Sequence, residues 1–233
     1  MSIKKSKGFT LVEMLVVIAI ISVLAAALFP AISSALSTAA ATALKTKGRG
    51  IWIAITSANT EREQHNEGAL WPKDLTEDED ISFTESAVGY FNFLLSDGET
   101  TGTPTTDENK RIVADLKPET LIASGVTAAK LGDPLQEKNI AWGVVVIPDS
   151  APSEVAFLIS RNYTSDAKLK QTDEKSKASE ILDLDANVKP FNATRAVWVA
   201  RGGGVFDARP RYFTMSSLMG IGDSSTEYDY WAK

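Results

Sequence analysis

A single acidic residue, Glu13, lies in an otherwise uncharged apolar segment near the N-terminus. Residues 14–29 carry no charge and consist mainly of Ile, Val, Leu and Ala. A carboxylate at the centre of a membrane-spanning helix costs about 2.5–3.5 kcal/mol, and this cost falls toward the interface. Glu13 is therefore expected to act electrostatically, through a cationic partner or the positive end of a helix dipole.

The remaining candidates for chemistry are three clusters of carboxylates. Carboxylate oxygens bind Ca²⁺, but none of these clusters has the spacing of an EF-hand loop. The acidic run at 77–80 is equally typical of a solvated loop. We therefore expect no metal and no cofactor, with a structural calcium as the alternative. The clusters are residues 77–80, Asp183 with Asp185, and Asp223 with Glu227 and Asp229.

No catalytic constellation can be recognised in the sequence. His65 is the only histidine, which argues against a His-based metal site or catalytic triad. Three glycines at 202–204 are not followed by a helix or by G-K-[ST], so they indicate a turn rather than a phosphate-binding loop. The net charge of −6 argues against nucleic acid as a partner. The sequence therefore predicts a protein that is not an enzyme.

The N-terminal segment has the features of a membrane-spanning helix. With its flanks it approaches the roughly 20 residues that are needed to cross the hydrocarbon. Lys4, Lys5 and Lys7 precede it, and the positive-inside rule then places this stub in the cytoplasm and the rest outside. A secretory signal peptide cut near residues 25–27 and a plain signal anchor are the alternatives. Glu13 argues against a signal peptide, because a charge weakens its apolar core, and a plain signal anchor would have no need of this residue.

Residues 9–65 are predicted to form one long helix. Pro30 lacks a backbone donor and should kink it, and Gly48 and Gly50 are expected to form a second weak point. Beyond the glycines, apolar residues recur at helical spacing and should pack as one stripe on a folded domain. These residues are Ile51, Ile55 and Ala58.

The rest of the chain changes from short helices to strands. Trp71-Pro72 is predicted to form a turn, Thr84 to cap a short buried helix that stops at Gly98, and residues 118–124 to form a further helix. From residue 139 the pattern is that of antiparallel strands joined as hairpins. The expected strands are residues 140–147, 154–161, 194–200, 205–206 and an edge strand at 212–215. The segment 165–179 is expected to be a surface excursion, and the aromatics near the C-terminus should dock on the domain.

The sequence G-F-T-L-V-E, followed by the apolar run, resembles the prepilin signature of type IV pilins and type II secretion pseudopilins. The resemblance implies that a prepilin peptidase cuts between Gly8 and Phe9 and that Phe9 is then N-methylated. It also implies that Glu13 meets the N-terminal ammonium of a neighbouring subunit during assembly, and that Pro30 is the recurring proline of the family. The match covers residues 4–32.

The resemblance implies a pilin-like α+β fold, with a long N-terminal helix packed on a C-terminal antiparallel sheet. The expected organisation is a leader peptide at 1–8, a transmembrane and assembly half of the helix at 9–32, and its second half at 33–67. Residues 68–233 would form an extracytoplasmic globular head. Loss of the leader removes three lysines and changes the formal charge from −6 to −9.

The expected function is that of a structural subunit in a type IV pilus-like filament. The absence of cysteine and the long polar excursions favour a type II secretion pseudopilin over a pilus subunit. Expected partners are the prepilin peptidase, like or related pilin subunits and the inner-membrane assembly machinery. The protein would cross the bacterial inner membrane once, with its N-terminus cytoplasmic and its head periplasmic or extracellular. The alternative is a membrane-anchored binding protein or enzyme that carries a prepilin-type signal.

Overall fold

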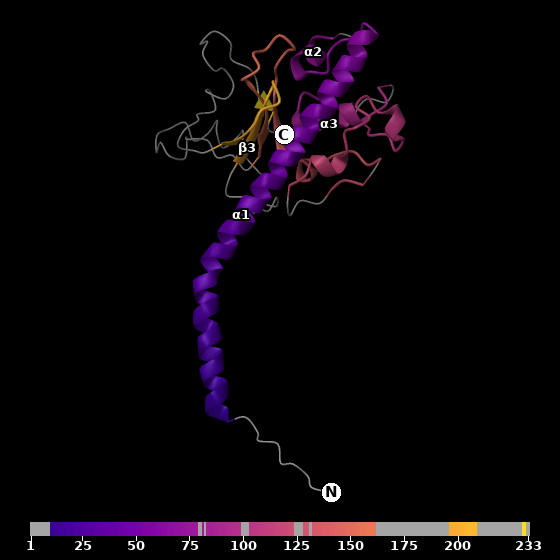
Figure 1. Cartoon of the computed structure of the whole chain (residues 1–233). Coiled ribbons are helices and arrows are strands. Elements are labelled where there is room, and N and C mark those ends of the chain that lie inside the picture. Colours follow the sequence, from indigo (N-terminus) through magenta and orange to yellow (C-terminus); the bar gives the residue numbers. More distant parts are fainter. Residues whose placement is uncertain are drawn as a thin grey trace, which may run out of the picture.

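One long helix, α1, extends out of a folded head that packs along its C-terminal part (Figure 1). The computed structural model describes residues 10–78, 81, 83–98, 103–123, 128–130, 132–161, 196–208 and 230–231. This order of a long helix followed by an antiparallel sheet is the predicted α+β arrangement. The α-helices are α1 (Leu11–Gln64), α2 (Pro72–Glu77) and α3 (Ala87–Leu95), and three short 3₁₀ helices cover Glu108–Lys110, Pro118–Thr120 and Glu137–Asn139.

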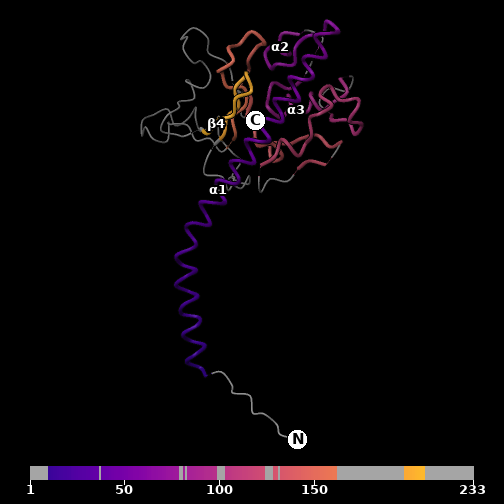
Figure 2. Tube along the Cα trace, viewed as in Figure 1, coloured from indigo at the N-terminus to yellow at the C-terminus, as the bar shows by residue number. Residues whose placement is uncertain are grey.

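Helix α1 is continuous from Leu11 to Gln64, as Figure 2 traces. Pro30 lies inside the helix, and Figure 1 shows that α1 bends between its free end and the head. The helix passes through Gly48 and Gly50, the predicted weak point, without interruption. The head holds this part of α1 in place, and that packing outweighs the intrinsic helix cost of glycine.

The second half of α1 buries one stripe against the head. The predicted stripe is confirmed and begins earlier than expected, at Ala41. Successive members are three or four residues apart, except that Ala54 and Ile55 are adjacent, so they lie on one side of the helix. Gly48 occupies one place in this series. The buried members are Ala41, Leu44, Ile51, Ala54, Ile55 and Ala58.

The sheet is antiparallel with the order β4-β3-β2-β1-β5. Both predicted hairpins are confirmed, because β1 pairs with β2 and β3 pairs with β4. Helix α1 contacts β3 and β4, and α3 contacts β1, so the core lies where these elements meet. The strands are β1 (Trp142–Val145), β2 (Ala156–Ser160), β3 (Ala196–Ala200), β4 (Val205–Ala208) and β5 (Tyr230–Trp231).

The ends of the short elements differ from the prediction in several places. Trp71 does not form a turn with Pro72 but precedes α2, which Pro72 begins with its fixed backbone angle. The cap of α3 is Ser86 rather than Thr84: its hydroxyl accepts a hydrogen bond from the Gly89 N–H at 3.0 Å. The helix expected at 118–124 is reduced to the 3₁₀ turn Pro118–Thr120.

Two of the C-terminal aromatic residues lie in an additional strand that the sequence pattern did not predict. Tyr230 and Trp231 form β5 and pair with Val145 and Val144 of β1. The predicted edge strand at 212–215 and the excursion at 165–179 lie outside the described residues.

Candidate functional site

Glu13 lies in the first turn of α1 and forms a capping box with Thr10. Thr10 is the N-cap residue, and the Glu13 carboxylate accepts hydrogen bonds from the Thr10 backbone N–H at 2.8 Å and from the Thr10 hydroxyl at 2.7 Å. In return the Glu13 N–H donates to the Thr10 hydroxyl at 3.3 Å. This reciprocal capping box satisfies orphan donors at the helix start and places negative charge at the positive end of the helix dipole. The S/T-x-x-E spacing in the sequence could have predicted it.

The N-terminal half of α1 presents its apolar side chains outward on every side. Leu11 is 81% exposed and Phe29 is 75% exposed. Among the described residues, α1 is the one helix that is long and apolar enough to cross a membrane, and its most apolar stretch makes no contact with the head. The only hydroxyl between Met14 and Phe29, that of Ser22, donates to the Ile18 carbonyl at 2.7 Å and so needs no outside partner.

Three cations of α1 fix the helix to the base of the head. Lys45 Nζ lies 2.9 Å from Asp207 Oδ1 in β4, and Lys47 Nζ donates to the Ile122 carbonyl at 2.9 Å. Arg49 donates to the carbonyl of Gly203 in the turn between β3 and β4. Burial lowers the pKa of Lys47, and the nearby charge of Glu119 partly opposes that shift. Each cation therefore ties α1 to a different segment of the head.

The glycine turn between β3 and β4 serves helix packing, which confirms the predicted turn. Gly203 has a φ of 81°, and a Cβ there would lie 2.8 Å from three atoms of the Trp52 indole. Trp52 Nε1 donates to the Arg201 carbonyl at 2.6 Å. Glycine is required at this position both for its backbone angle and for its close contact with α1.

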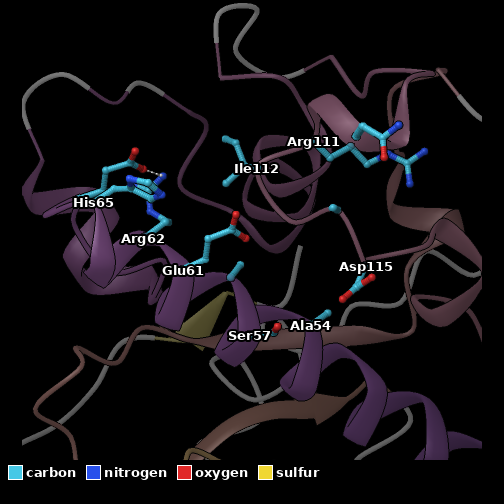
Figure 3. A pocket seen from close by; sticks show the side chains of 12 residues that line it. Ala54, Ser57, Glu61, Arg62, His65, Arg111, Ile112 and Asp115 are labelled. Carbon is cyan, nitrogen blue, oxygen red and sulfur yellow. Dashed lines mark ion pairs between the residues drawn. The ribbon is translucent and has the colours of Figure 1, made fainter.

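A groove of about 310 Å³ lies between the last turns of α1 and residues 109–115, and Figure 3 shows the side chains that line it. Glu61 and Asp115 point into it, while Ser57 and His65 lie at different ends. Arg62 pairs with Glu67 at 2.8 Å. No nucleophile lies beside a base in this groove, so its described residues form no catalytic constellation of the serine–histidine type.

A second pocket, of about 400 Å³, lies between α1 and the hairpin turns. Arg201 pairs with Asp149 at 2.8 Å and lies over the Trp71 ring. Beside the pocket, burial raises the pKa of Asp74, and the charges of Asp149 and Glu77 add to this shift. The Asp149 N–H donates to Asp74 at 2.8 Å and works in the opposite direction, as does the charge of Arg201.

Within the described part of the chain, no three acidic or histidine side chains are grouped closely enough to hold a metal ion. Of the carboxylates considered for calcium, Glu77 ends α2 and Asp78 follows it. Residues 79 and 80 and the acidic residues at 183, 185, 223, 227 and 229 lie outside the described residues, as do Gly8 and Phe9.

One family model, that of the prokaryotic N-terminal methylation motif, matches residues 3–29. Searches of curated proteins and of solved structures gave no match. The motif spans the stub, the Thr10–Glu13 capping box and nearly all of the exposed apolar half of α1. This N-terminal motif supports a type IV prepilin-like protein.

Proposed function

We propose that the chain is the precursor of a structural subunit in a type IV pilus-like filament. The observation that carries this proposal is the N-terminal half of α1, which is apolar enough to cross a membrane and is exposed on all sides. It begins with the Thr10–Glu13 capping box, inside the methylation motif. An uncovered apolar helix of this length needs lipid or other helices around it. Both environments are available to a subunit that starts in the inner membrane and ends in a filament.

Processing between Gly8 and Phe9 would create a free ammonium group next to Thr10. Glu13 already lies at this end of the helix, one turn away, with its carboxylate bound to Thr10. We propose that this carboxylate pairs with the ammonium of a neighbouring subunit and so sets the register of assembly. The charge, rather than the capping hydrogen bonds, would then be the essential property of Glu13.

Mass spectrometry of the N-terminal peptide from the native host tests the processing step. We expect a peptide that begins at N-methylated Phe9. A peptide that begins near Leu28, or an intact Met1, would contradict the proposal and move attention to a cleaved or simply anchored domain. In that case the two pockets of the head would become candidates for the alternative function, a membrane-anchored binding protein or enzyme.

The substitution Glu13→Gln tests the role of the charge, because its amide oxygen can still accept the hydrogen bond from Thr10. We expect normal cleavage but an approximately tenfold or greater loss of incorporation into filaments, which corresponds to about 1.4 kcal/mol. Glu61→Gln, at the exposed far end of the same helix, is the matched control and should assemble normally. Equal assembly of both variants would refute the proposed pairing.

Within this family the chain fits a type II secretion pseudopilin better than a pilus subunit. The preference depends on the absence of cysteine, since no disulfide can close a loop of the head. The proposed partners are the prepilin peptidase, like or related subunits and the inner-membrane assembly machinery. Deletion of the gene in the native host separates the two branches: loss of protein secretion supports the pseudopilin, and loss of surface pili with normal secretion contradicts it.

A further inference from the structure

The pocket between α1 and the hairpin turns contains unsatisfied polar groups in its lining. Three buried side-chain atoms of its lining residues have no hydrogen-bond partner: Thr56 Oγ1, Asn59 Nδ2 and Arg201 Nε. Such atoms are rare in native proteins, because each has lost its bonds to water without gaining a bond to protein. Three of them around one pocket indicate that a bound molecule completes their hydrogen bonds.

Thr56 differs from the other threonines in the body of α1. Four of these donate their hydroxyl proton to the carbonyl four residues earlier, the usual partner of a threonine in a helix: Thr38, Thr42, Thr46 and Thr60. The Thr56 hydroxyl makes no such bond. Its capacity to donate and to accept is therefore available to a molecule in the pocket.

The protein itself orients the two nitrogen donors of the pocket. Asn59 Oδ1 accepts a hydrogen bond from the Leu70 N–H at 2.7 Å, which fixes the amide and leaves Nδ2 to donate elsewhere. Arg201 is held by its ion pair with Asp149 at 2.8 Å and by the Trp71 ring under its guanidinium. Donors that are already in place bind a ligand at a smaller entropic cost.

The exposed side of the pocket has the opposite hydrogen-bonding character. Glu63 and Glu67 line it there, and Asp149 lies beside Arg201. These carboxylates accept hydrogen bonds and repel an anionic ligand, whereas Asn59 and Arg201 can only offer donors to it from within. A hydroxyl group both donates and accepts, so a neutral ligand with several hydroxyl groups satisfies both sides.

Two indole rings complete the walls. Trp52 Nε1 donates to the Arg201 carbonyl at 2.6 Å and Trp71 Nε1 donates to Asp149 at 2.8 Å, so both indole N–H groups already have partners. The rings therefore contribute apolar surface, which suits the C–H groups of a sugar ring. None of the lining residues belongs to a strand, so the pocket offers no strand edge to an extended peptide.

We propose that this pocket binds a neutral carbohydrate, whose hydroxyl groups bond to Thr56, Asn59 and Arg201. Its volume of about 400 Å³ lies within the range of about 300–1,000 Å³ that is usual for small-molecule sites. Binding here requires neither cleavage of the precursor nor assembly. The inference therefore goes beyond the proposed filament function and can fail or succeed independently of it.

Saturation-transfer difference NMR tests the proposal on the full chain in micelles of a zwitterionic detergent, which has no sugar head group. The probes are glucose, galactose, mannose, N-acetylglucosamine and maltose, each added alone, with trialanine amide as a peptide probe. We expect saturation of at least one sugar and none of the peptide. Thr56→Val should weaken binding of that sugar by about threefold to tenfold, the effect of one hydrogen bond.

Two further variants make the test specific. Thr56→Ser keeps a hydroxyl and should retain the affinity, as should Thr46→Val, the matched control, whose hydroxyl bonds to its own helix outside the pocket. Equal weakening by Thr46→Val and Thr56→Val would overturn the proposal, as would saturation of no sugar or of the peptide alone. Without ligand, Thr56→Val should be at least as stable as the natural chain, and a marked loss of stability would show that this hydroxyl is bonded within the protein.

Discussion

The two halves of α1 belong to one unbroken helix but obey different rules. The N-terminal half is apolar on all sides and exposed, and its polar groups bond to their own backbone. The half from Ala41 onward alternates between a buried stripe and polar side chains that bind three segments of the head. In the first half the apolar composition alone determines which surroundings the helix needs. In the second half the packing on the head depends on which residue stands at each position.

Truncation of a buried apolar residue should show the largest difference between the halves. Ile55 is fully buried, so Ile55→Ala should lower the free energy of unfolding by about 2–5 kcal/mol. Ile53→Ala, at a position 51% exposed, should change it by less than about 0.5 kcal/mol. Ile21→Ala, in the exposed half, should leave unfolding of the head unchanged.

Denaturation of the full chain in detergent micelles, followed by tryptophan fluorescence, measures these effects. All five tryptophans lie at or beyond Trp52, so the signal reports the head and the docked half of α1. A comparable loss for Ile53→Ala and Ile55→Ala would show that the stripe is placed wrongly.

Two glycines, separated by a single residue, sharpen the comparison within the docked half. A Cβ on Gly48 would lie 2.7 Å from Val199 Cγ2 and 2.8 Å from Trp142 Cη2, so Gly48→Ala should destabilise by about 1–3 kcal/mol. A Cβ on Gly50 would meet nothing within 4 Å, so Gly50→Ala should stabilise by about 0.5–1 kcal/mol through helix propensity. The same denaturation series measures both, and effects of equal sign would argue against the close approach of α1 to the sheet.

The smallest predicted effect concerns the pH dependence of the head. Because the pKa of Asp74 is raised in the folded state, the native protein holds this proton more tightly than the unfolded chain does. Ionisation of Asp74 therefore costs stability as the pH rises above its ordinary value of 3.8. Asp74→Asn cannot ionise and still offers an oxygen to the Asp149 N–H.

The difference in unfolding free energy between Asp74→Asn and the natural chain should accordingly increase in favour of the variant as the pH rises. Denaturation at several pH values above 3.8 measures it. A difference that stays constant, or one that decreases with rising pH, would show that burial does not dominate the pKa of this carboxyl.

Much of the fold could be predicted because it depends on local pattern. The long helix, its buried stripe and both hairpins follow from periodicities of about 3.6 and 2 residues and from turn residues between them. The capping box of Thr10 and Glu13 is also readable from its S/T-x-x-E spacing. The exact caps were less predictable, since Thr84 and Ser86 are both residue types that cap helices well, and the structure has Ser86 as the cap.

The sequence by itself determined the methylation motif, the long apolar helix and the two hairpins, because each depends on residues that are close together along the chain. Only the tertiary structure decided that Gly48 is a contact with Trp142 and Val199 instead of a weak point. It likewise decided that Gly203 fits against Trp52 and that Tyr230 and Trp231 close the edge of the sheet. These features join residues far apart in the chain, so no local pattern records them, and the two glycine contacts depend on close packing.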